Sequence, residues 1–130
     1  MPNPLDSSPV IFRCTRRMAL ADGVLVDANQ GEFAAVSHEH FPDHHLALTS
    51  AVFALINAAV ETAEGADFAG LWHDILWMSR VCPVRLLPGG HTFKVGIRQG
   101  PFLRWHELKI LFHGGDHGEP CATVMLRGED

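Results

Sequence analysis

The sequence lacks features that mark several common protein classes. Its three cysteines, Cys14, Cys82 and Cys121, have no CxxC spacing, so we expect free buried thiols and neither a disulfide framework nor a zinc knuckle. No apolar run approaches the roughly 20 residues that cross a bilayer, and no apolar segment follows a basic start as in a signal peptide. These absences predict a soluble, cytoplasmic protein without membrane contact.

Positive charge is scarce as well. Ten basic residues stand against 15 acidic ones, for a net charge of −5. This argues against direct nucleic-acid binding, which depends on Lys and Arg at the phosphates. The charge is uneven, since residues 1–75 carry ten acidic and three basic residues whereas residues 76–130 carry five acidic and seven basic ones. Such asymmetry can orient an approaching partner, and a match between two halves of one fold explains it equally well.

Motifs of common catalytic sites are missing too. The chain has no G-K-[ST] of a P-loop, no G-x-S-x-G nucleophile elbow and no motif that ties a cysteine to a histidine base. His73 and Asp74 form the pair found in metal-dependent phosphohydrolases of the His-Asp type, but those enzymes need further ligands on other helices of an all-helical domain. We interpret His73 instead as a partly buried histidine beside two core aromatics, Trp72 and Trp77.

The residues that are present suffice for one folded unit. With 130 residues, 47% of them hydrophobic, the chain can bury the core of a single domain. Residues 1–10 are rich in Pro, Ser and Asn and predict a flexible leader, and residues 11–130 predict one α+β domain. Its first part is a helix-strand unit, with a helix from Thr15 that stops at Gly23 and a strand over residues 24–29.

Two helices and a sheet follow. Apolar residues recur at three- and four-residue steps from Thr49 to Gly65, and Asp67 can cap a second, almost wholly apolar helix that Pro83 ends. The short connection predicts an antiparallel helix pair. Further along, the period falls to two over residues 92–98, 107–113 and 122–127, which predicts a three-stranded antiparallel meander packed on the helices.

One face of this meander is a candidate binding surface. If the other face covers the helices, this face displays basic side chains around an apolar middle, a composition common at protein interfaces. The candidate partner-binding residues are Lys94, Arg98, Lys109, Leu111, Met125 and Arg127.

The segment SHEHFPDHH, residues 37–45, is a candidate metal site. Its candidate ligands to zinc or nickel are His38, His40, Asp43 and His44. The spacing comes close to the H-x-H-x-D-H signature of metallo-β-lactamase-like hydrolases, but two residues separate His40 from Asp43, and the chain is too short for that fold. A solvated His-rich loop or a pH-sensitive contact explains the histidines without a metal.

Two other interpretations stay open. The segment HGGDHGE, residues 113–119, fits the tip of a hairpin, with metal or phosphate binding as the weaker alternative. A small ligand between the sheet and the helices near Trp72 and Trp105 is a further alternative.

Four segments, MALADGVLVD, FPDHHLALTSAVF, LWHDILWMSR and GEPCATVML, resemble a family of small bacterial, plasmid and phage domains of unknown function. The match spans residues 15–126, with Phe53 where the family pattern favours Trp, and the pattern lacks the histidines of residues 38–45. The resemblance implies a single α+β domain with a terminal antiparallel sheet and supplies no activity. The family's occurrence on mobile elements implies an accessory or counter-defence protein that binds a host or plasmid protein.

We therefore predict a non-catalytic, protein-binding accessory protein of a mobile genetic element that needs no cofactor, with counter-defence inhibition as one form of its role. The alternative is a zinc- or nickel-binding protein, including a hydrolase, that uses the cluster of residues 38–45. Homodimerisation is left open.

Overall fold

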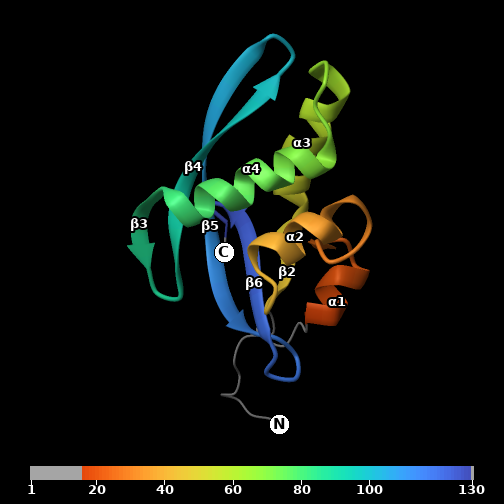
Figure 1. Ribbon diagram of the computed structural model, residues 1–130. Coiled ribbons are helices and arrows are strands. Elements are labelled where there is room, and N and C mark those ends of the chain that lie inside the picture. Colours follow the sequence, from red (N-terminus) through yellow and green to blue (C-terminus); the bar gives the residue numbers. More distant parts are fainter. Residues whose placement is uncertain (1–15, 130) are drawn as a thin grey trace.

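The computed structural model of the chain describes residues 16–129, so the expected leader and Cys14 lie outside the described residues. A six-stranded sheet with the order β1-β2-β6-β5-β4-β3 runs through the molecule (Figure 1). The strands are β1 Leu25–Asp27, β2 His45–Thr49, β3 Pro83–Leu87, β4 Gly90–Gln99, β5 Phe102–Gly114 and β6 Pro120–Leu126. Neighbouring strands are antiparallel except for β2 and β6, which are parallel.

The helices lie before, between and beside these strands. They are α1 Arg16–Ala21, the 3-10 turn η2 Gly31–Phe33, α2 Ala34–His40, α3 Ser50–Thr62 and α4 Phe68–Val81. The predicted α+β class and the helix-strand unit of α1 and β1 are confirmed. Among residues 16–129, no helix combines the length and the hydropathy that a membrane span requires.

The sheet is larger than predicted. Strands β4, β5 and β6 form the antiparallel meander, but β1, β2 and β3 extend it to six strands, so the prediction of a three-stranded sheet is wrong. Strand β2 lies inside the sheet between β1 and β6 and is buried on both faces after His45, so it shows no alternation of buried and exposed residues. Strand β3 is a mostly exposed edge, so it shows no buried face either.

The two long helices begin where the sequence predicts, and α3 ends at Thr62, three residues before the expected stop at Gly65. The Thr49 side chain accepts a hydrogen bond from the Val52 amide (3.4 Å), and the Asp67 carboxylate accepts one from the Gly70 amide (2.7 Å). These caps satisfy amide groups that have no partner within the first helical turn. Pro83 follows Cys82, the residue after the end of α4, as expected for a residue that cannot continue a helix.

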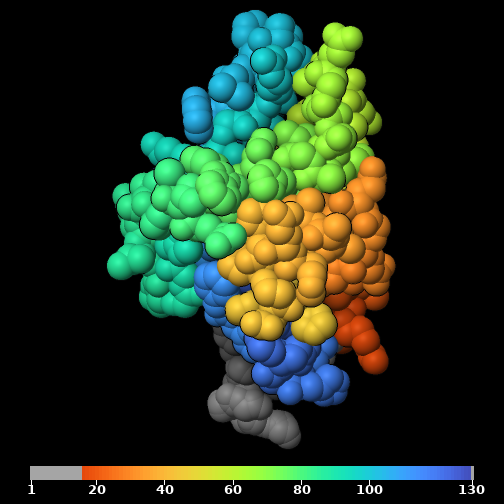
Figure 2. Space-filling view, in the orientation of Figure 1, coloured from red at the N-terminus to blue at the C-terminus, as the bar shows by residue number. Residues whose placement is uncertain are grey.

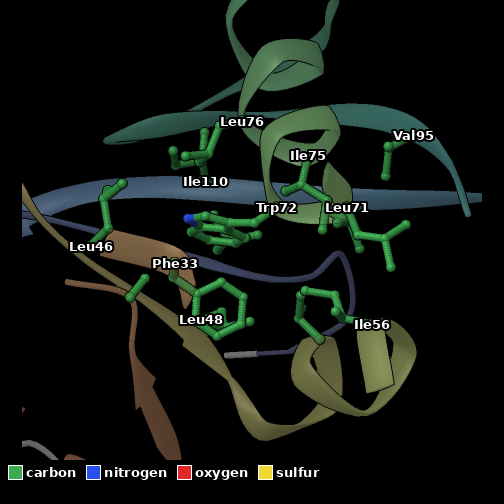
Figure 3. Packing of buried hydrophobic residues seen from close by; sticks show 14 of the residues in the cluster. Phe33, Leu46, Leu48, Ile56, Leu71, Trp72, Ile75, Leu76, Val95 and Ile110 are labelled. Carbon is green, nitrogen blue, oxygen red and sulfur yellow. The ribbon is translucent and has the colours of Figure 1, made fainter. Parts of the chain in front are cut away.

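The core lies between one face of the sheet and helices α3 and α4, and Trp72 of α4 is at its centre (Figure 3). The indole is fully buried and meets the Phe33 ring edge-on at 5.6 Å between ring centroids. Its Nε1 donates to the Ser37 hydroxyl (2.8 Å), and that hydroxyl donates to the Ala28 carbonyl (2.6 Å). The one polar atom of the largest core side chain is therefore satisfied, as buried polar groups require.

The β5–β6 connection has a contact that the sequence does not predict, and one of the two described cysteines is exposed. The segment 115–119 does form the β5–β6 connection, but Asp116 also accepts hydrogen bonds from the Arg16 and Arg17 amides (2.8 and 3.1 Å) at the start of α1. These two amides hold the pKa of the Asp116 carboxyl below its ordinary value. Cys121 is free and buried as predicted, whereas Cys82 is exposed, because the chain leaves α4 there.

The hairpin of β4 and β5 projects beyond the rest of the sheet. It extends past α4 and ends beside the C-terminal end of α3 (Figures 1 and 2). Here the Gly100 amide donates to the Thr62 hydroxyl at 3.0 Å. The outer half of the hairpin is thereby held against the helices, with α4 crossing below it.

Candidate functional site

The predicted partner-binding residues do not form one open surface. Lys109 donates from Nζ to the Glu129 carbonyl, and Arg127 forms an ion pair with Glu107 at 3.2 Å. Met125 is buried, whereas Lys94 and Arg98 are exposed on β4. The sixth residue of the set, Leu111, is partly buried. Partner binding at these residues stays a prediction, and two of its four cations already have partners within the chain.

The predicted metal ligands are divided between two places. His38 and His40 lie on α2, where two positions correspond to a rotation of about 200°, so they cannot face one ion. His38, Asp43 and His44 line an open depression of about 390 Å³, whereas His40 is buried on the opposite side. Among residues 16–129, no group of three or more His, Cys, Asp or Glu side chains is arranged to hold a metal ion.

His40 instead meets His73 of α4, a contact that no sequence pattern indicates. Its Nε2 lies 2.9 Å from His73 Nδ1, and the Arg80 guanidinium donates from Nη1 to His40 Nδ1 at 3.2 Å. Because a guanidinium cannot accept, Nδ1 of His40 must carry the lone pair and Nε2 the proton. His40 is therefore neutral and donates to His73, whose ring in turn stacks on Trp77 with 6.4 Å between centroids.

The surroundings of His40 favour this neutral form. Burial is the largest cause that lowers the pKa of His40. The nearby His73 and Arg80 lower this pKa further, whereas Glu39 raises it. A histidine whose pKa is lower in the folded state binds more protons when unfolded. Protonation would also place a second positive charge against Arg80 and remove the acceptor of its hydrogen bond.

We expect the free energy of unfolding to fall as the pH is lowered through about 6.5, the ordinary pKa of histidine, and to level off below the lowered pKa of His40. The measurement is urea unfolding from about pH 7.5 to about pH 5, for the wild type and for His40→Gln. Burial also lowers the pKa of His106, so both proteins share a contribution from that residue. The difference in the free energy of unfolding between the wild type and His40→Gln therefore reports the contribution of His40. Parallel curves for the two proteins would contradict the prediction.

A groove opens between α4 and the β4–β5 hairpin. Three large side chains line it and are largely exposed, Trp77 at 47%, Leu103 at 55% and Trp105 at 64%. The groove holds about 200 Å³, and Asp74, Met78, Val95 and Gly96 complete its walls. We call it the α4–hairpin groove.

The position of Trp77 corrects the sequence interpretation. Trp72 is a core aromatic as predicted, but Trp77 is on the surface, so the prediction for Trp77 is wrong. Five helical positions separate the two, a rotation of about 140°, so both could not face the same core. Trp72 lines none of the cavities described here and Trp105 is exposed on β5, so the two do not enclose a common ligand space.

Gly96 allows the hairpin to form its wall of the groove. A Cβ at this position would lie 3.1 Å from Cδ1 of Leu103, which is tighter than ordinary van der Waals contact. The glycine therefore gives the Leu103 side chain room to lie across β4. Asp74, Gly96 and Leu103 also line an adjoining depression of about 450 Å³, together with Glu64, Asp67, His73 and Arg98.

Asp74 is the carboxylate common to both spaces. Burial raises its pKa, and the neighbouring His73 lowers it in part. Among residues 16–129 the only ion pair is that of Arg127 with Glu107, so no Lys or Arg of this part of the chain neutralises Asp74. The groove thus combines two exposed indoles with one carboxylate that forms no ion pair within residues 16–129.

No family model, curated protein or solved structure matches the chain.

Proposed function

We propose that the chain is a non-catalytic protein-binding domain that holds a partner in the α4–hairpin groove. The observation that carries the proposal is the joint exposure of Trp77, Leu103 and Trp105 around one concave space. Exposed large apolar side chains that gather in one place mark interaction sites, and Trp is among the residues that contribute most to binding energy.

The other chemical groups of the chain favour binding over catalysis. The histidine pair has its protons fixed by Arg80, and His40, as a buried neutral donor, is not open to a substrate. The carboxylate of Asp74 lies beside apolar walls, with no nucleophile such as Ser or Cys among the residues that line the groove. The resemblance to phage and plasmid domains that the sequence suggests makes a host or plasmid protein the first partner to seek.

The proposal is tested by comparing capture of partners by the wild type with capture by the double variant Trp77→Ala and Trp105→Ala. Two indoles at an interface centre supply several kcal/mol, so we expect at least a tenfold loss of the specifically captured protein, on the order expected from hot-spot residues. Quantitative mass spectrometry of cross-linked complexes measures this loss. Circular dichroism verifies the fold, which substitutions at exposed sites should leave intact.

Phe102→Ala is the matched control. Phe102 is 64% exposed on the same strand as Trp105 but is not among the residues that line the groove. This variant should capture the partner as the wild type does. Equal capture by the double variant would contradict the proposal, and equal loss in both would mean that capture reflects general stickiness of the hairpin.

A further inference from the structure

We propose that the α4–hairpin groove accepts a lysine or arginine side chain of the partner, with its aliphatic stem between Trp77 and Trp105 and its cationic head at Asp74. The inference rests on the proposed function and adds the chemical class of the ligand. Two independent features carry it: the shape and composition of the walls, and the distribution of charge around them.

The walls fit a long side chain with an apolar stem. Trp77 and Met78 contribute from α4, and Leu103 and Trp105 contribute from β5, so apolar groups line both sides of a space of about 200 Å³. Lys and Arg bury their methylene stems along apolar surfaces while the charged end stays at a polar site. In this groove the polar site is Asp74, the one acidic residue of its lining.

The indole rings favour a cation over an anion or a neutral group. The faces of an aromatic ring carry negative electrostatic potential, and Trp binds cations better than Phe does. Trp77 and Trp105 expose about half or more of their surface, so ring surface is open to a ligand. A purely aliphatic side chain of the partner would also fit between Trp77 and Trp105, but it would leave the Asp74 carboxylate without a cation.

The charges around Asp74 point in the same direction. Burial raises the pKa of Asp74, and a bound cation would offset that cost of ionisation. Glu64 and Asp67 line the adjoining depression, so acidic groups surround the groove on that side. Among the nearby basic groups, Arg98 and His73 line the adjoining depression and not the groove itself. Lys94 is exposed on the same face of β4 as Gly96, and its cross-strand neighbour is Glu107 of β5. Within the described part of the chain no Lys or Arg lines the groove, so a cation from a partner has room beside Asp74.

The test uses two small probes and the indole N–H signals of the full chain in nuclear magnetic resonance. The probes are Nα-acetyl-lysine N-methylamide and Nα-acetyl-norleucine N-methylamide, which differ by the ammonium group. We expect the lysine probe to shift the signals of Trp77 and Trp105, with buried Trp72 as the unshifted reference, and to bind at least about tenfold more tightly than the norleucine probe.

Two variants locate the charge. Asp74→Asn should remove the preference for lysine over norleucine, whereas Asp22→Asn, at an exposed acid outside the groove, should retain it. Equal binding of both probes, or no shift with either, would overturn the inference. If capture of the protein partner still depends on Trp77 and Trp105 in that case, the proposed function stands and only the ligand class is wrong. If that dependence is lost too, the groove is not a binding site.

Discussion

Replacing Trp72 by alanine is expected to lower the free energy of unfolding by about 3 to 5 kcal/mol. The indole is fully buried, and its removal leaves a cavity at the point where α4, η2 and the sheet meet. The substitution also removes the donor to the Ser37 hydroxyl, which is itself buried. Because small domains are stable by only about 5 to 15 kcal/mol, this loss is a large share of the total. Urea unfolding followed by circular dichroism measures it.

Trp77→Ala is the matched control for this prediction, since Trp77 lies on the same helix and is exposed. We expect it to change the free energy of unfolding by less than about 1 kcal/mol. Trp72→Phe should fall between the two, because it keeps most of the apolar volume and loses the hydrogen bond to Ser37. A result in which Trp72→Ala and Trp77→Ala destabilise equally would contradict the described packing of α4.

The same two tryptophans show how far the sequence can predict this fold. Period and capping residues predicted α3 and α4 correctly, because Thr49 and Asp67 act through hydrogen bonds within three residues. An almost wholly apolar helix gives no such guide to orientation, since its pattern does not distinguish a core face from an exposed interaction face. The rotation between Trp72 and Trp77 was the available signal, and only the packed structure shows which of the two is buried.

Non-local contacts account for the other differences. Strand β2 follows the His-rich segment and pairs in parallel with β6, about 75 residues away in the chain, through a crossover that local patterns cannot specify. The histidines of residues 38–45 suggest one cluster only because they are neighbours in sequence. His38 and His40 lie two positions apart on α2 and therefore point in different directions, and the side chain of His40 contacts His73 on another helix. The α4–hairpin groove likewise lies between α4 and the strands β4 and β5, so the sequence of either segment by itself does not predict the groove.

Gly90→Ala is expected to destabilise the chain by about 3 kcal/mol, at the upper end of the usual cost of overpacking. A Cβ at residue 90 would clash with the Ile110 carbonyl oxygen and would lie 3.0 Å from the Leu111 Cα. These are backbone atoms of β5, so no side-chain rotation can relieve the contact. Gly90 pairs with Leu87 of β3 and Leu111 of β5, and the strands must therefore separate locally.

The control is Gly128→Ala, where an added Cβ would meet nothing within 4 Å and the backbone is not in the left-handed region. Thermal and urea unfolding should leave this variant within about 0.5 kcal/mol of the wild type. Hydrogen exchange of Gly90→Ala should show faster exchange first in β3 and at the start of β4. Since Gly96 and the α4–hairpin groove lie further along the same strand, wild-type exchange there would mean that the strain is confined to the β3 end. Faster exchange throughout β4 would instead mean that the groove depends on the strand register that Gly90 permits.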